Sequence, residues 1–303
     1  MKSGYRIRKR RGKVSGTGIA IAVALVAGLL LSGGCYDDCD DTVVYETVVV
    51  VDDIPPSAPD GLVSITGDGV VYLEWNPNRE PDLDGYALYY NYDGGLQYTL
   101  LADLDKDQNW YDDYDVVNGV TKYYAVSAYD IEGYESDLSY EDVWDTPRPE
   151  GTGLVLYDYL GQNSDLSGYD FSGLTGIAQA WDSIDPATDI YFGTPNGERV
   201  MFARGTGVDI QDYGYADYFD EVGWAPVKGY VPGPDKQVAL IPGHIYIVRV
   251  LNQVSGLYNY AKIHVTELTA EYVRLDWAYQ TDPGNPELAP GNQESAPGKG
   301  EAS

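Results

Sequence analysis

The sequence predicts an all-β protein. Its 303 residues include 29 tyrosines but only 4 phenylalanines, together with 35 glycines and 17 prolines. Tyrosine favours half-buried strands, and frequent glycine and proline indicate many turns. Apolar and polar residues also alternate over several short stretches, whereas no stretch after residue 34 has the period of a helix. The length corresponds to about two domains.

Residues 1–34 have the organisation of an export signal. Seven basic residues and no acidic residue precede the apolar run from Ile19 to Leu31. A basic head and an apolar core of about 7–15 residues are typical of a signal peptide, whereas a bilayer span needs about 20 apolar residues. We therefore expect a signal peptide. An uncleaved membrane helix is the alternative, because the small residues Gly18 and 32–34 could lengthen the span.

The segment before Cys35, LLSGGC, resembles the lipobox of bacterial lipoproteins. That family prefers leucine three residues before the lipidated cysteine; here Ser32 stands there and Leu31 is one step further back. The resemblance implies that Cys35 is the mature N-terminus and carries the lipid that anchors the protein to the membrane. Tyr36 follows in place of the aspartate that would suggest inner-membrane retention, so the outer membrane is expected.

Residues 35–55 are expected to form an acidic tether between the anchor and the first domain. Cys39 lies in this tether and is expected to be a free or intermolecularly paired thiol. The whole chain has a net charge of −29, and the expected signal holds basic residues but no acidic one, so the exported part is more acidic still. Nucleic acid is excluded as a partner because phosphate binding needs a basic surface.

Residues 56–148 show the alternation of an antiparallel sandwich. The stretch VVYLEWNP places Val71, Leu73 and Trp75 on one face and Tyr72 and Glu74 on the other. The stretches DGYALYY and KYYAVSAYD repeat this pattern, and turn-rich segments separate them. Regular spacing of such strands is typical of a two-sheet sandwich.

Within this region, PSAPDGL, VVYLEWNPNREPDLDGYALYY and YYAVSAYDIEGYES resemble a bacterial fibronectin type III domain. The resemblance implies an immunoglobulin-like β-sandwich with a central tryptophan strand. It departs from the family at one place. The tyrosine that usually fixes the corner of this fold falls at Lys122, with Tyr123 beside it, so either the register shifts or the corner hydrogen bond is absent.

Two acidic stretches of the first domain space their carboxylates as calcium loops do. In DLDKDQNWYDD, Asp103, Asp105 and Asp107 match three ligand positions of an EF-hand. However, Gln108 stands where the loop needs glycine, and Tyr114 stands where a closing glutamate is needed. We therefore expect solvated loops both here and in NREPDLDG, rather than an ordered calcium site.

Residues 150–281 are expected to form a second β-rich domain. A hairpin places Ala261, Ile263 and Val265 inward with Lys262, His264 and Thr266 outward, and YVRLDWAYQ turns Val273, Leu275, Trp277 and Tyr279 inward. The stretch 205–235 has little periodicity, so we expect a long loop. Its aromatic residues could stack on a ring or a sugar, and with His244 they are the candidate ligand contacts: Tyr213, Tyr215, Tyr218, Trp224 and Tyr230.

The segments DIYF, YFDEVGWAPVKGY, GHIYIVRV and YAKIHVTELTAEYVRLDWAYQ resemble the β-rich, HmuY-like haem-binding lipoproteins of bacterial surfaces. The resemblance covers the framework of that family, but its haem-ligating histidines match no position here. The chain has two histidines, His244 and His264, and we expect them to serve as ordinary polar residues rather than as haem or metal ligands.

No catalytic motif is present in the sequence, so we expect a protein that is not an enzyme and needs no cofactor. The leading interpretation is a lipid-anchored adhesion or scaffolding module with a protein or glycan partner. The alternative is a lipoprotein that captures haem, a glycan or another small molecule through its second domain. Residues 282–303, rich in proline and glycine, are expected to be a disordered tail.

Overall fold

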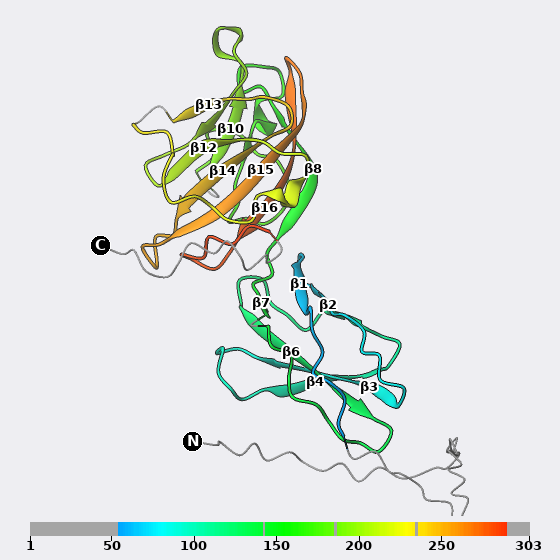
Figure 1. Ribbon diagram of the computed structural model, residues 1–303. Coiled ribbons are helices and arrows are strands. Elements are labelled where there is room, and N and C mark those ends of the chain that lie inside the picture. The colour runs from blue at the N-terminus through cyan, green and yellow to red at the C-terminus, as the bar shows by residue number, and fades with distance from the viewer. Residues whose placement is uncertain (1–53, 142, 185–186, 234–235, 290–303) are drawn as a thin grey trace, which may run out of the picture.

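The computed structural model describes residues 54–141, 143–184, 187–233 and 236–289, which form two β units stacked end to end (Figure 1). Cys35 and Cys39, the expected signal peptide and the tether up to residue 53 lie outside the described residues. The all-β prediction is confirmed, since the described elements are strands and three short 3₁₀ turns. Within the described residues, no helix is long and apolar enough to cross a membrane.

The first unit is a sandwich of two antiparallel sheets, one ordered β1-β2-β5 and the other β4-β3-β6-β7. This seven-strand arrangement is fibronectin type III-like, as the sequence predicted. The strands are β1 (Val63–Thr66), β2 (Val71–Glu74), β3 (Leu83–Asn91), β4 (Thr99–Asp105), β5 (Trp110–Asp113), β6 (Lys122–Asp130) and β7 (Val143–Asp145).

The core of the first unit follows the predicted alternation. Val71, Leu73 and Trp75 are buried, whereas Tyr72 and Glu74 on the same strand are exposed. The Trp75 ring packs edge-on against Tyr86, with 5.5 Å between ring centroids. Burial of such large rings dominates the stabilisation of a small core.

Lys122 fills the corner where the fibronectin type III resemblance leads one to expect a tyrosine. Its side chain is fully buried, and its Nζ donates to the backbone oxygen of Asp115 at 3.0 Å. Nζ also lies 2.7 Å from Asp113 Oδ2 and 4.3 Å from the centre of the Tyr90 ring. The corner bond to the upstream backbone is thus present, with an ammonium as its donor.

The second unit also has two sheets, ordered β12-β14-β15-β16-β8 and β13-β11-β10-β9, and its main core lies between them. Its strands are β8 (Glu150–Tyr157), β9 (Gly168–Tyr169), β10 (Ile190–Gly193), β11 (Val200–Ala203), β12 (Val208–Tyr215), β13 (Gln237–Ala239), β14 (His244–Leu251), β15 (Tyr258–Leu268) and β16 (Tyr272–Gln280). The predicted hairpin is β15–β16, and its predicted inward residues are buried. The 3₁₀ turns are η1 (Ser164–Leu166), η2 (Pro195–Gly197) and η3 (Phe219–Glu221).

The expectation of a single long loop over 205–235 is wrong. Strand β12 runs through its first half and pairs with β14 from Val208 to Tyr215. The high content of Gly and Asp masked an alternation in which Val208 and Ile210 point to the core. The segment after β12 then folds back over the outer face of the five-stranded sheet.

This covering segment corrects a second expectation, because Lys262 is fully buried rather than solvent-facing. Ala216, Val222 and Ala225 pack with Ile245 and Ile247 over that face. Lys262 Nζ donates to Phe219 O at 2.8 Å and lies 3.0 Å from Asp220 Oδ1. Alternation identified the face of the sheet but could not show that a later segment covers it.

Residues 282–289 are not part of a disordered tail as predicted, because they pack against the second unit. Leu288 is fully buried in the small core under the covering segment. Its N–H donates to Gly223 O at 2.7 Å, and Ala225 N donates to Pro286 O at 2.8 Å. The proline and glycine content of this segment predicted disorder, but its residues form backbone hydrogen bonds and apolar contacts with the second unit.

The two units meet through a buried polar junction around the connecting residues 146–149. Gln280 Nε2 donates to Thr146 O at 3.3 Å, and Asn285 Nδ2 donates to Thr146 Oγ1 at 3.2 Å. Arg148 is fully buried, with an Nη atom 3.6 Å from Glu150 and 3.8 Å from Asp220. These contacts link the two units where they meet (Figure 1).

Candidate functional site

The three exposed tyrosines among the predicted ligand contacts lie on or just after β12, the edge strand of the five-stranded sheet. Tyr213, Tyr215 and Tyr218 are 51%, 68% and 61% exposed. A β-bulge between Asp212 and Gly214 leaves Tyr213 without a cross-strand partner. Tyr215 lies over Gly243, where a Cβ atom would come 2.8 Å from its ring.

His244 stands opposite Tyr215 in the β12–β14 ladder, and its Nδ1 lies 2.9 Å from Asp212 Oδ1. His264 pairs with Ile245, whose side chain belongs to the face opposite that of His244. The two histidines therefore project from opposite faces of one sheet and cannot ligate a common ion.

Trp224 and Tyr230 are separated from the exposed tyrosines by their packing. Trp224 is half-buried at the junction, where its ring meets Trp144 at 6.1 Å. Tyr230 is half-buried with its ring 4.2 Å from Arg249 Cζ, and burial raises the pKa of its hydroxyl. The structure thus gives these two residues packing roles and does not bring all six predicted contacts into one site.

A different group of aromatic side chains gathers on the outer face of the four-stranded sheet. We name Tyr159, Trp181, Tyr191 and Phe202 the aromatic cluster; all four are half-buried. Tyr191 on β10 stands opposite Phe202 on β11, and their rings stack with centroids 4.6 Å apart at 8°. Their strand neighbours Ile190, Phe192, Met201 and Ala203 point the other way into the core.

Tyr159 lies at the centre of the cluster and contacts its three other members. Its ring centroid is 5.5 Å from Trp181, 5.4 Å from Tyr191 and 5.8 Å from Phe202, with the rings steeply inclined to one another. Edge-to-face contacts of this kind stabilise each pair by about 0.5–1.5 kcal/mol beyond area burial. The four rings therefore form a preorganised apolar surface.

The backbone around the cluster is shaped to hold these rings. A Cβ atom at Gly193 would clash with the Tyr159 ring, so only glycine permits that packing. Asp158 accepts hydrogen bonds from Leu160 N at 3.0 Å and from the Thr194 hydroxyl, which fixes the start of the loop. Arg204 donates to the backbone oxygens of Asp182 and Ser183 and so holds the loop that carries Trp181.

Sequence reasoning missed the aromatic cluster because its members come from four separate segments. A usable signal existed, since Tyr191 in IYFG and Phe202 in VMFA occupy the face that alternates with the core residues. Aromatic residues on the outer face of two paired strands indicate a covered or functional surface. The sequence alone does not show that the loops carrying Tyr159 and Trp181 lie beside these two strands, so the full cluster could not be predicted.

Other features do not suit ring stacking. A hollow of about 710 Å³ in the first unit is lined by residues 57, 58, 60 and 76–80, and no described aromatic side chain lines it. Among the described residues, the acidic group close enough to share a cation is Asp82, Asp130 and Glu132, which also lies in the first unit.

Comparison with known proteins gives partial similarities. No family model matches the chain. An amylopullulanase from Thermoanaerobacterium saccharolyticum is 28% identical over 131 residues, which are 43% of this chain and 9% of the amylopullulanase. The chain thus spans only a small part of that relative.

Among solved structures, an Fn3-like protein from Clostridium thermocellum is 27% identical, with a TM-score of 0.26, covering 30% of this chain and 94% of that protein. A β-1,2-glucanase from Parabacteroides distasonis is 26% identical, with a TM-score of 0.26, covering 31% of this chain and 14% of the glucanase.

Proposed function

We propose that this protein is a non-catalytic, surface-attached binding protein whose second unit binds a glycan through the aromatic cluster. The observation that carries the proposal is the group of four rings held together on the outer face of one sheet, each with part of its surface open to solvent. Aromatic rings combine apolar area with little conformational freedom, which suits them to the C–H face of a sugar.

Polar groups beside the rings supply the second requirement of glycan binding. Asp182 is exposed next to Trp181, and Arg204, which follows the end of the strand that carries Phe202, is half-buried. Sugar hydroxyls both donate and accept hydrogen bonds, so a carboxylate and a guanidinium near an apolar ring match their chemistry. The similarity between 43% of this chain and part of an amylopullulanase agrees with a glycan as the ligand class.

The first unit acts as a spacer in this proposal. Its described chain begins at residue 54. The coloured ribbon starts at the end of the first unit remote from the second (Figure 1). A lipid anchor at Cys35 would attach the chain below that end. The second unit then lies away from the membrane. In that position the aromatic cluster can contact large glycans or a neighbouring surface.

The exposed tyrosines of β12 are the competing binding surface, and matched variants separate the two. We expect the purified chain to retain oligosaccharides on a glycan array, and Trp181→Ala to weaken that binding roughly tenfold or more through loss of ring contact. Tyr215→Ala removes a more exposed ring on the other sheet and is expected to bind like the unaltered protein. Circular dichroism of each variant checks that it is folded.

The opposite pattern, with binding lost in Tyr215→Ala and kept in Trp181→Ala, would place the site at β12. Failure of the unaltered protein to bind any glycan, with retained binding to cells, would favour a protein-binding scaffold. Haem capture stays a prediction of the resemblance, and a haem titration tests it. A Soret shift that His244→Ala abolishes would support capture of haem in place of a glycan.

A further inference from the structure

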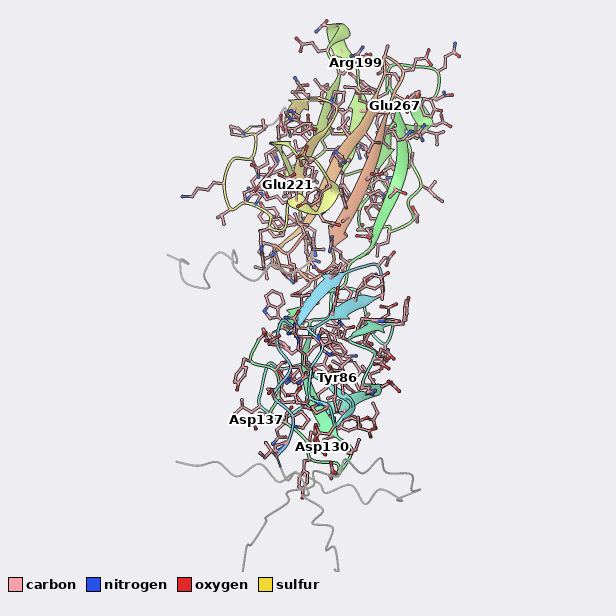
Figure 2. The ribbon with its side chains drawn as sticks, turned by 45° about the vertical axis from the view of Figure 1, so that its right-hand side comes forward. Tyr86, Asp130, Asp137, Arg199, Glu221 and Glu267 are labelled. Atoms are coloured by element: carbon pink, nitrogen blue, oxygen red, sulfur yellow. The ribbon has the colours of Figure 1, made fainter. Side chains whose placement is uncertain are left out.

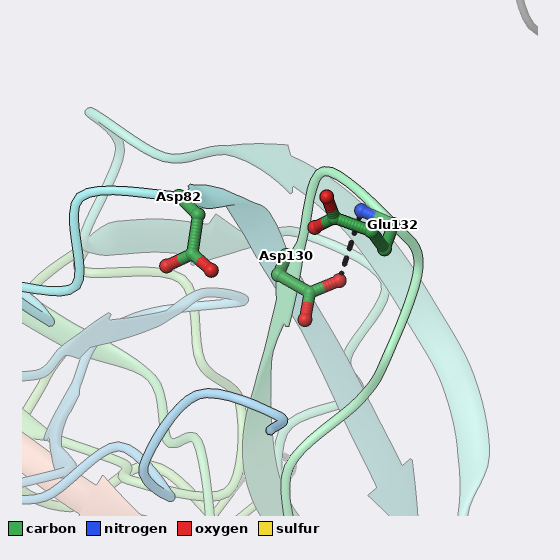
Figure 3. Close-up of side chains that lie close together, drawn as sticks. All are labelled: Asp82, Asp130 and Glu132. Atoms are coloured by element: carbon green, nitrogen blue, oxygen red, sulfur yellow. Dashed lines mark hydrogen bonds between the residues drawn. The ribbon is translucent and has the colours of Figure 1, made fainter. Parts of the chain in front are cut away.

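Three carboxylates from two separate segments converge at the end of the first unit remote from the second (Figures 2 and 3). Asp82 precedes β3, Asp130 ends β6, and Glu132 lies in the turn that follows. Each offers an oxygen atom within 4.8 Å of an oxygen from the other two. The pairing of Leu83 with Asp130 and the hydrogen bond from Ile131 N to Asp82 O, 3.0 Å, fix the two segments together.

Asp130 is the buried member of this group, with an exposed fraction of 1%. Its Oδ1 accepts hydrogen bonds from Glu132 N at 3.0 Å and from Tyr134 N at 2.8 Å, which close the turn. Its Oδ2 is also buried, yet it has no hydrogen-bond partner among the described residues. A buried carboxylate oxygen without a partner is costly, and native proteins rarely leave one unsatisfied.

The neighbours of Asp130 increase this cost instead of relieving it. Asp82 and Glu132 carry the same charge and lie beside Asp130, with oxygen atoms of the three residues within 4.8 Å of one another (Figure 3). The ion pairs formed by the described residues join none of the three to a lysine, arginine or histidine. Like charges at this separation repel unless a cation lies between them.

The geometry points to a divalent cation site formed by Asp82, Asp130 and Glu132, with Ca²⁺ as its cation. The ligands are all carboxylate oxygens, which hard cations prefer, whereas zinc favours nitrogen and sulfur. Three protein carboxylates with an open side for water suit the flexible, high coordination of Ca²⁺ better than the strict octahedron of Mg²⁺. The cation would occupy the place left beside Oδ2 and tie the start of β3 to the end of β6.

The test uses the full chain, stripped with a chelator and kept at moderate salt to screen diffuse counterions. Calorimetric titration with CaCl₂ is expected to show saturable binding, and thermal melting is expected to shift upward when Ca²⁺ is added. Asp130→Asn keeps the Oδ1 acceptor of the turn but removes the charge, and Glu132→Gln alters an exposed residue that the fold does not need. Both are expected to weaken Ca²⁺ binding at least tenfold.

Asp137→Asn is the matched control, because Asp137 is an exposed acid on the same end of the unit but outside the group (Figure 2). It is expected to bind Ca²⁺ as the unaltered chain does. Absence of saturable heat in the unaltered chain would overturn the site. Glu132→Gln binding at full affinity, or Asp137→Asn losing as much affinity as Glu132→Gln, would show only diffuse attraction to an acidic surface.

Discussion

Lys122 and Asp113 form an ion pair inside the first unit, with 2.7 Å between Nζ and Oδ2 and side-chain exposures of 0% and 1%. The Tyr124 hydroxyl donates to the same carboxylate oxygen at 2.9 Å. A lysine thus takes over the corner that a tyrosine usually fixes, and a buried carboxylate has to accompany it because an unpaired buried charge is costly.

We predict that Lys122→Met destabilises the first unit by about 3–5 kcal/mol, because it leaves the Asp113 charge buried without a cation, with only the Tyr124 hydroxyl and the Asp115 N–H as hydrogen-bond donors. Guanidinium unfolding followed by tryptophan fluorescence measures the loss. Lys106→Met, at an exposed lysine of the same unit, is the control and is expected to have little effect. The double variant Lys122→Met with Asp113→Asn is expected to recover part of the loss; a cost no smaller than the sum of the single variants would contradict the coupling.

Burial of Lys262 makes the stability of the second unit depend on pH. Desolvation, together with repulsion from Arg148, lowers the pKa of Lys262 to about 7, although Asp220 acts in the opposite direction. The unfolded chain therefore binds more protons at this residue than the folded one between pH 7 and the ordinary lysine pKa of 10.5. In that window its contribution to the free energy of unfolding rises with pH.

Lys262→Met removes this contribution. We therefore expect the free energy of unfolding of the variant, relative to that of the unaltered chain, to be higher at pH 6 than at pH 9. Denaturant unfolding of both proteins at several pH values measures the difference between their free energies of unfolding. The other titrating groups are the same in both proteins, so their effects largely cancel in this difference. Lys228→Met, at an exposed lysine that follows the covering segment, is expected to show no such trend. A pH-independent difference for Lys262→Met would mean that the amine keeps its ordinary pKa in the fold.

Gly193 offers a test of the aromatic cluster that touches none of its rings. Gly193→Ala forces the Tyr159 ring to move, so we expect weaker glycan binding, a changed near-ultraviolet circular dichroism spectrum and about 1–3 kcal/mol lower stability. Gly223→Ala is the matched control, since its added Cβ would lie 4.0 Å from the Cβ of Ala289, at ordinary contact distance. An unchanged spectrum and affinity in Gly193→Ala would show that Tyr159 does not organise the cluster.

The lipid anchor at Cys35 stays a prediction, because this residue lies outside the described part of the chain. We expect intact-mass analysis of the membrane-extracted protein to give a species that starts at Cys35 and carries acyl mass. Cys35→Ser is expected to move the protein from the detergent phase to the aqueous phase. A membrane-bound species that keeps residues 1–34 and has no added mass would instead indicate an uncleaved helix.

Period-2 patterns predicted the strands whose one face is buried, such as Val71, Leu73 and Trp75, because alternation depends only on local sequence. They failed where a distant segment decides burial. Lys262 stands at a solvent-facing position of its strand, yet residues 219–222 of the covering segment surround its amine. The aromatic cluster and the carboxylate group depend in the same way on pairing between distant strands, which one sequence does not specify.

The bound segment 282–289 determines the order in which the two units can complete their folding. Its residue Asn285 donates to Thr146 of the junction, and Leu288 completes the small core over Ile245 and Ile247. The first unit can therefore reach its native state soon after residue 148 has emerged, whereas the second unit has to wait for residue 289. Until then its outer face and the polar groups of the junction remain unprotected, so the synthesis of residues 149–289 is the interval in which this protein is most exposed to proteases and to misfolding.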